Sequence, residues 1–143
     1  MINRLFGDQT MSVLSNALRA TDLEHQVIAH NLANIDTPGF KRSEVMFQTT
    51  LAAALKAQAD GSDQLQGTRT NPTHISIGDV ASPSEVQGQA IVRAETSLRP
   101  DGNNVDIDAE MTRLSENTVL YQALSQLVKM KLTALRSAIR EGR

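Results

Sequence analysis

Three histidines are the side chains best suited to acid–base catalysis or metal binding in this chain. His25 and His30 lie five positions apart, which on a helix separates the two side chains by about 140°. They therefore cannot share a helix face and bind one metal ion. His74 is distant from both and has no acidic residue beside it. We expect one histidine in a helix contact, two at the surface and no metal site.

An acidic stretch, Asp101–Glu110, contains oxygen ligands of the kind that calcium prefers. An EF-hand loop that began at Asp101 would need an oxygen ligand at its fifth position, glycine at its sixth and glutamate at its twelfth. The chain has Val105, Asp106 and Thr112 at these places. We therefore interpret the stretch as a turn followed by a helix N-terminus, where carboxylates are favourable.

Nucleophilic catalysis has equally little support in the sequence. No serine stands in a Gly-x-Ser-x-Gly elbow, no glycine-rich phosphate loop is present, and cysteine is absent. The basic tail from Lys129 to Arg143 could bind anions or lipid head groups, but its interleaved leucines favour a solvated flank beside a packing surface. We expect no catalytic residue, no cofactor and no metal ligand, and hence a protein that is not an enzyme.

The composition favours packed helices over an aromatic core. Of the 143 residues 40% are hydrophobic, yet there is no tryptophan, one tyrosine and three phenylalanines. The aliphatic residues suit helix-on-helix packing in a chain whose length suggests one domain. A net charge of −2 gives no reason to expect nucleic acid as a partner. Residues 1–8 lack the apolar core of a secretory signal peptide, and no run is long enough to span a membrane.

Heptad patterns dominate both ends of the chain. Apolar and small side chains recur at alternating intervals of three and four, which predicts one helix from about residue 11 to 34 and another from Asp106 onward. Asp106 and Asp108 are placed to cap the second helix. The residues predicted to form the packing and assembly seam are Met11, Leu14, Leu18, Ile28 and Leu32 in the first helix, and Leu114, Tyr121, Leu124, Val128, Leu132, Leu135 and Ile139 in the second.

The two helices pair most economically as an antiparallel coiled-coil hairpin. Both seams include polar positions, such as Thr21 and Thr118, which lower stability but can fix register and partner number. The hairpin alone would bury only part of the apolar surface, so we expect the rest to pack against other subunits. A heterologous contact whose rotation does not close generates a helical assembly. The outward residues are expected to be chiefly Leu120, Leu124, Leu127, Val13 and Val27.

The middle of the chain is less regular. Val45–Ala59 predicts a short third helix with Phe47, Leu51 and Leu55 on one stripe. Residues 60–104 hold three of the four prolines and predict an extended loop with room for one small hairpin. The strand-like runs Ile75–Ile77 and Ala90–Val92 are too short to form a sheet on their own.

The fold class is therefore predicted as mainly α, within one structural domain. Its parts are an N-terminal helix and turn (1–42), a short helix and extended loop (43–104) and a C-terminal helix (105–143).

The most specific pattern is the turn after the first helix, Asn31-Leu32-Ala33-Asn34-Ile35-Asp36-Thr37-Pro38-Gly39-Phe40-Lys41-Arg42. Pro38 presets φ and Gly39 tolerates the positive φ of a type II turn, so the helix must end by about Asn34 to Asp36. The run resembles the N-terminal signature of the bacterial flagellar axial proteins, which form the rod, the hook and the hook–filament junction. The signature residues are Asn31, Asn34, Thr37, Pro38, Gly39, Phe40 and Lys41.

A C-terminal block narrows this resemblance to the rod of the basal body. Asn104–Met111, Tyr121–Leu124 and Ala138–Arg143 are similar to the proximal rod protein of the family. The middle is too short for the folded domain that hook and distal rod proteins carry. The resemblance implies a structural subunit of the proximal rod, a helical tube that transmits torque and surrounds the export channel.

The same resemblance implies partners and a location. The implied partners are other copies of the chain, other rod proteins, and ring, adaptor and export-gate components of the basal body. The implied location is the periplasmic rod, reached by flagellar export without a cleaved signal peptide. A sibling rod protein is the alternative within the family. A soluble coiled-coil adaptor or chaperone is the alternative outside it, since it would share the seams without needing the Thr-Pro-Gly-Phe turn.

Overall fold

The structure is a computed structural model, and it describes residues 8–59, 82–94 and 99–141. Within these ranges the elements are, in order, helix α2 (Asp8–Ala33), strand β1 (Ser43–Val45), helix α3 (Gln48–Ala59), strand β2 (Ala90–Val92) and helix α4 (Ile107–Glu141). The chain is mainly helical, as its composition and heptads predict.

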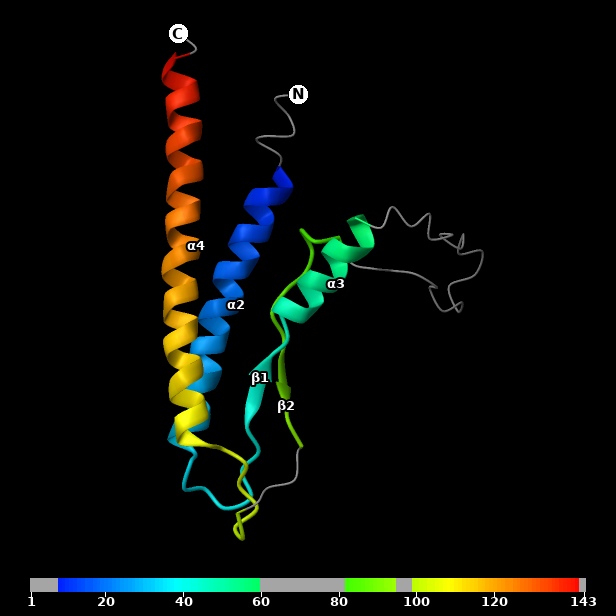
Figure 1. Cartoon of the computed structure of the whole chain (residues 1–143), viewed down its shortest axis with the longest axis vertical. Coiled ribbons are helices and arrows are strands. Elements are labelled where there is room, and N and C mark those ends of the chain that lie inside the picture. The colour runs from blue at the N-terminus through cyan, green and yellow to red at the C-terminus, as the bar shows by residue number, and fades with distance from the viewer. Residues whose placement is uncertain (1–7, 60–81, 95–98, 142–143) are drawn as a thin grey trace, which may run out of the picture.

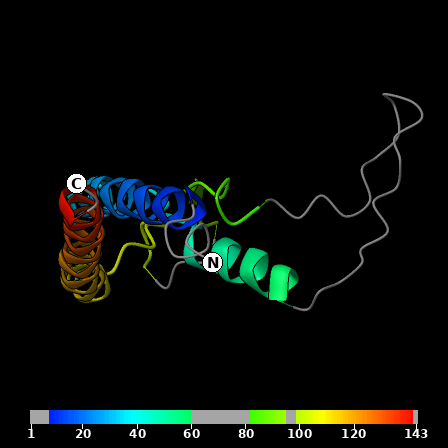
Figure 2. The same cartoon turned by 90° about the horizontal axis from the view of Figure 1, so that it is seen from above.

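Helices α2 and α4 are antiparallel and define the long axis of the molecule (Figure 1). They lie side by side where α2 ends and α4 begins, and they diverge toward the other end, as the view from above also shows (Figure 2). Helix α4 has 35 residues and α2 has 26, so α4 continues beyond the region of contact. The predicted pairing of the terminal helices is confirmed. Within the described residues, no helix is both long and apolar enough to cross a membrane.

The helix boundaries follow from local chemistry. The Asp106 carboxylate accepts hydrogen bonds from the backbone amides of Asp108 (2.9 Å) and Ala109 (3.5 Å), which makes it the N-cap of α4 as predicted. Asp108 and Glu110 place negative charge in the first turn of α4, where the helix dipole favours it.

The short sheet corrects the prediction for the middle of the chain. The third helix begins at Gln48, three residues later than predicted, because Val45 belongs to strand β1. Strand β1 pairs antiparallel with β2, and Glu44 faces Ile91. Ala90–Val92 is indeed a strand, but its partner lies almost fifty residues earlier, so the pair is not a local hairpin. Ile75–Ile77 lies outside the described residues.

The apolar core is small and lies between α2, α3 and the loop before β2. Phe47 is its one large buried side chain, and Leu124 of α4 is partly buried against this core. Leu55, expected on the same stripe as Phe47, is instead exposed. The buried members of the core are Ala17, Ala20, Phe47, Ala54 and Val86.

Gly88 brings the loop before β2 into close contact with α2. A Cβ atom at this position would lie 3.0 Å from Cβ of Ala20 and 3.3 Å from Cγ1 of Val45. Because Ala20 sits on a helix, it cannot swing aside as a flexible side chain would.

We predict that Gly88→Val lowers the free energy of unfolding by about 2 kcal/mol. Overpacking typically costs 1–3 kcal/mol, which exceeds the gain of about 0.4–1 kcal/mol from a stiffer unfolded chain. Urea denaturation of the purified chain measures the change, and Gln87→Val at the neighbouring exposed position is the control. Equal stability of the two variants would contradict the close contact at Gly88.

Candidate functional site

The signature turn closes directly behind α2. The backbone amides of Asn34, Thr37 and Phe40 donate to the carbonyls three residues earlier, at 3.1, 3.0 and 3.3 Å respectively. Gly39 has a φ of 72°, which is the value that a type II turn requires at its third position. The end of the helix at Ala33 and the predicted Thr37–Phe40 turn are therefore confirmed.

Asn103 holds this turn against the loop that precedes α4. Its side chain is completely buried, and Nδ2 donates to the carbonyls of Asn34 (2.9 Å), Ile35 (3.0 Å) and Thr37 (2.9 Å). Its Oδ1 accepts from the amide of Val105 at 2.8 Å. Carbonyls freed by the end of a helix need partners, and one side-chain amide supplies them here.

Three further contacts hold the signature turn in place. The amide of Gly39 donates to the carbonyl of Asp101 at 2.8 Å. The ammonium group of Lys41 donates to the carbonyl of Gly102 at 2.8 Å. Phe40 lies beside His30, with ring centroids 5.4 Å apart. Signature residues thus contact both the end of α2 and the loop before α4.

Asn31 forms a second buried connection, to strand β1 and to α4. Its Oδ1 accepts from the amide of Ser43 (2.9 Å), and its Nδ2 donates to the carbonyl of Ser43 (2.8 Å) and to Oε2 of Glu110 (3.0 Å). Asn31 is 0% exposed and Glu110 is 1% exposed. One side chain of the signature therefore pairs with the backbone of β1 like a neighbouring strand, and also binds a carboxylate from the first turn of α4.

Two arginines neutralise the buried carboxylate of Glu110. Its Oε1 lies 3.6 Å from Nη1 of Arg113 and 4.0 Å from Nη1 of Arg42. Within the described residues this oxygen accepts no hydrogen bond, so it is held by charge alone. A buried charge is tolerated only with such partners.

Arg42, Asn104 and Arg93 extend the polar connections to β2. The amide of Arg42 donates to Oδ1 of Asn104 (2.7 Å), whose Nδ2 donates to the carbonyl of Arg93 (2.9 Å). The guanidinium of Arg93 binds both oxygens of Glu44, at 3.0 and 3.2 Å. This hydrogen bond from Arg93 is the main reason that the pKa of Glu44 is lowered.

A third buried asparagine joins the two long helices. Nδ2 of Asn117 donates to the carbonyl of Thr21 at 2.9 Å, and both residues are buried. Asn117 lies one heptad after Glu110 and one heptad before Leu124, so the face of α4 that contacts α2 carries these three residues. We name the set of Asn31, Asn103, Asn104, Glu110 and Asn117 the polar clamp.

Some of the predicted seam residues are buried in the contact between α2 and α4, and others are exposed. Ile28 is buried, whereas Tyr121 and Leu132 are about half exposed and Ile139 is 76% exposed. Leu124, which we expected to face outward, packs against the chain's own core, and Leu120 lines a groove beside it. The partly buried members of the seam are Met11, Leu14, Leu18, Leu32, Leu114, Val128 and Leu135.

The structure does not bring catalytic side chains together in the part that it describes. His25 and His30 are both exposed, and no group of three His, Asp or Glu residues could hold a metal ion among the described residues. What the arrangement can do is mechanical: it fixes the angle at which the chain leaves α2 and ties that exit to the start of α4.

Sequence reasoning missed most of the polar clamp. Asn31 was singled out for its place in the signature, and Asn104 and Glu110 stood within the C-terminal block, but neither was assigned as its partner. Asn103 has one usable sequence signal, because it follows the turn-forming dipeptide Asp101-Gly102, and Gly102 indeed has a φ of 74° in the structure. The hydrogen bond between Asn31 and Glu110 joins residues 79 positions apart, and no periodic pattern in the sequence indicates it.

Comparison with known proteins agrees with the resemblance carried by the signature turn. The sequence profile of the family described as "Flagella basal body rod protein" matches residues 11–41, which are most of α2 and the signature turn. The flagellar basal body rod protein FlgB of Bacillus subtilis is 34% identical over 134 residues, covering 94% of this chain and 95% of that protein.

Similar relatives occur in distant bacteria. The FlgB protein of Borreliella burgdorferi is 33% identical and covers 85% of this chain and 84% of its own length. The FlgB protein of Escherichia coli is 30% identical over 141 residues, covering 96% of this chain and 99% of that protein. With identities of this size over nearly the full length, the chain belongs to the FlgB family of flagellar basal body rod proteins.

Proposed function

We propose that the chain is a structural subunit of the proximal rod, and that its copies assemble with other rod proteins into a helical tube that surrounds the export channel and transmits torque. The observation that carries this proposal is the apolar stripe on the second half of α4, where Leu132 and Ile139 lie one heptad apart on the same helix face and are 50% and 76% exposed. A monomeric protein seldom leaves such a stripe in water, so it indicates a protein contact.

The polar clamp suits this role. Torque passes through a subunit only if its parts do not move relative to one another. Buried hydrogen bonds between specific partners fix one geometry, whereas apolar packing alone tolerates sliding. The clamp joins the exit of α2 to the first turn of α4 through Asn31 and Glu110.

The proposal includes the wider setting of the subunit. Its partners are other copies, other rod proteins, and the ring, adaptor and export-gate components at the base of the rod. It reaches the periplasmic rod through flagellar export without a cleaved signal peptide. Copurification with basal bodies, and position along the rod, would separate this assignment from a sibling rod protein or a soluble coiled-coil adaptor.

We predict that Leu132→Glu abolishes motility by blocking rod assembly while leaving the folded chain intact. Leu132 is half exposed in the single chain, so a charge there costs little folding energy, but it would have to be desolvated in an assembled seam. Motility in soft agar and the presence of the chain in purified basal bodies give the readout. Circular dichroism of the purified variant checks the fold.

Ala134→Glu is the matched control, since it adds the same charge to an exposed position of the same turn on the opposite face of α4. It should leave motility near the wild-type level. Full motility of the Leu132→Glu strain would refute the assembly role of this stripe.

A further inference from the structure

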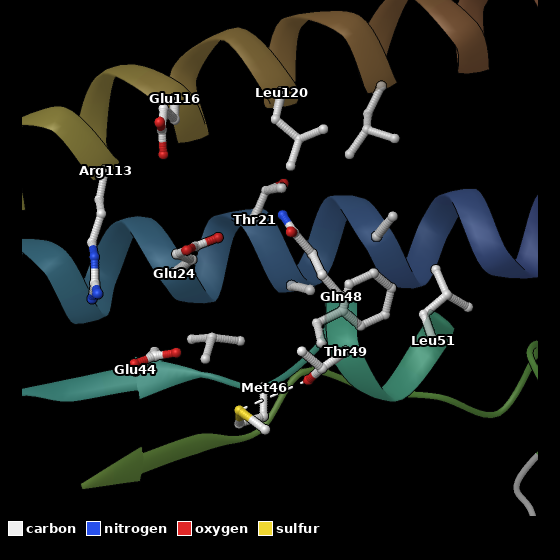
Figure 3. A pocket seen from close by; sticks show the side chains of 15 residues that line it. Thr21, Glu24, Glu44, Met46, Gln48, Thr49, Leu51, Arg113, Glu116 and Leu120 are labelled. Atoms are coloured by element: carbon white, nitrogen blue, oxygen red, sulfur yellow. Dashed lines mark hydrogen bonds between the residues drawn. The ribbon is translucent and has the colours of Figure 1, made fainter. Parts of the chain in front are cut away.

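A groove opens beside the helix pair, between α2, the segment from β1 to α3, and the first half of α4 (Figure 3). Its volume is 570 Å³, within the range of grooves that bind ligands. Ala17, Phe47, Leu51 and Leu124 supply apolar surface. Ala17 and Phe47 are buried in the core, but Leu51, Leu120 and Leu124 are only partly buried, so part of the apolar lining stays exposed in the single chain.

The edge of the groove is acidic. Glu24 comes from α2, Glu44 from β1 and Glu116 from α4, and Arg113 is the one cation among the described lining residues. Figure 3 shows Glu24, Glu44 and Arg113 gathered at the same end of the groove. Arg93 already forms an ion pair with Glu44. Glu24 and Glu116 are therefore the carboxylates that can pair with a cation from another molecule.

Glu24 sits in an unfavourable place for a charge. Burial raises the pKa of its carboxyl above the ordinary value, and the charges of Glu44, Glu116 and Glu110 raise it further, while Arg113 lowers it. Glu24 forms no ion pair with another residue in the described part of the chain. A cation from outside would relieve this cost.

The second half of α4 has the complementary surface. Residues 126–140 contain four basic residues and no acidic one. Leu132, Leu135 and Ile139 form an apolar stripe at intervals of three and four, and Arg136 flanks it. Lys129 and Arg140 lie on the same side of the stripe as Arg136, one heptad before it and one turn after it.

This surface cannot reach the groove of its own chain. The groove is lined by Arg113, Glu116, Leu120 and Leu124 of the same continuous helix. A straight helix rises about 1.5 Å per residue, so residues 128–139 lie farther along the axis of α4 than residues 113–124, which line the groove. They cannot fold back into it. The occupant must come from another molecule.

We propose that the groove of one copy receives the second half of α4 of a second copy, with the apolar stripe on the groove floor and Arg136 against Glu24 and Glu116. This rests on the proposed function and deepens it, since it names a contact within the assembly. The groove lies beside the middle of the molecule, whereas the second half of α4 extends beyond it to one end, so the two surfaces are different parts of the chain (Figure 1). Their contact is therefore heterologous, and it propagates into a helical array if its rotation does not close.

Charge reversal tests the contact. Glu116→Lys or Arg136→Glu in the full chain should weaken self-association, measured by sedimentation velocity over a range of concentrations, about tenfold or more. The two changes combined in one chain should restore the affinity to within about threefold of the wild type. Asp22→Lys and Lys56→Glu reverse exposed charges outside both surfaces and should change nothing. Failure of the double variant to recover would overturn the pairing.

Glu24→Gln separates association from folding. Above its raised pKa the charged Glu24 costs folding stability, and this cost disappears as the pH falls and the carboxyl becomes neutral. The neutral glutamine should therefore raise the unfolding midpoint of the chain at neutral pH and still weaken self-association. A lower midpoint would mean that Glu24 is a structural residue, and would overturn its role as a docking group.

Cross-linking in basal bodies distinguishes this contact from the proposed function. The chain has no cysteine, so Gln48→Cys in the groove and Ala138→Cys beside the stripe can be coexpressed as single-cysteine variants. We expect a disulfide-linked dimer of the chain in purified basal bodies. Basal bodies that contain the chain but give no dimer, or a cross-link to a different rod protein, would overturn the contact and leave the function standing. Basal bodies that lack the wild-type chain would overturn the function.

Discussion

Asn103→Asp should lower the free energy of unfolding by about 3 kcal/mol or more. This is a large effect for a substitution that only replaces the side-chain NH2 group with an oxygen. The side-chain amide of Asn103 donates to three carbonyls of the signature turn and is completely buried. Aspartate keeps the shape but replaces the donor with an oxygen, which would face the carbonyls of Asn34, Ile35 and Thr37. Hydrogen bonds would become repulsions, and a charge would be buried without a partner.

Asn103→Ala makes this prediction sharper. Alanine removes the donor without adding repulsion, so it should cost less than aspartate, about 1–3 kcal/mol for the carbonyls left without a partner. Urea denaturation ranks the variants, and hydrogen exchange at the amide of Gly39, which donates to Asp101, reports whether the turn has separated from the loop. Gln122→Glu, the same type of change at an exposed position of α4, should be within about 0.5 kcal/mol of wild type. Equal stability of the alanine and aspartate variants would contradict the clamp.

Features that depend on neighbours in the sequence could be predicted. The cap at Asp106 and the turn at Thr37–Phe40 are both determined within a few residues, by a carboxylate before a helix and by Pro-Gly at fixed turn positions. The two long helices followed from their heptad period, which is repeated often enough to be recognised in a single sequence.

Features that depend on contacts between residues far apart in the sequence could not be predicted. The Ala and Leu residues that follow Val45 predict a helix that includes it. Its pairing with Ala90 instead makes Val45 part of strand β1. Three residues of strand carry too little local signal to compete with twelve residues of helix. Tertiary pairing decided the structure there, against local propensity.

The inward face of α4 was misjudged for a related reason. We followed its apolar side chains, and these place the seam at Tyr121 and Leu132. The face of α4 that contacts α2 carries Leu124, which belongs to the predicted seam, together with Glu110 and Asn117, which do not. Two of these three are polar, and they are buried because specific partners satisfy them, which a hydrophobic pattern does not register. Tyr121, Leu132 and Ile139 of the predicted seam stay exposed in the single chain, where the proposed assembly needs them.

Glu110→Ala should cost about 3 kcal/mol, since it breaks a buried charge network by removing the residue that connects its members. Arg42 and Arg113 would lose their shared carboxylate, and Asn31 would lose one of its acceptors. We place the cost at the lower end of the usual 3–5 kcal/mol, because the side chains of Arg42 and Arg113 are 16% and 33% exposed and can recruit water. Rod assembly should fail in the corresponding strain, since the first turn of α4 would no longer be tied to the signature turn.

A double-mutant cycle with Asn31→Ala isolates the central hydrogen bond. Because Asn31 and Glu110 are in direct contact, the two losses should not add, and the coupling energy should lie in the range of about 0.5–3 kcal/mol. Glu110→Gln keeps an acceptor for Asn31 but removes the charge, so the difference between glutamine and alanine at this position separates hydrogen bonding from ion pairing. Glu116→Gln, two turns later and exposed, should leave the stability of the single chain within about 0.5 kcal/mol of wild type. Additive losses for Asn31→Ala and Glu110→Ala would show that this buried polar pair does not couple the signature turn to the C-terminal helix.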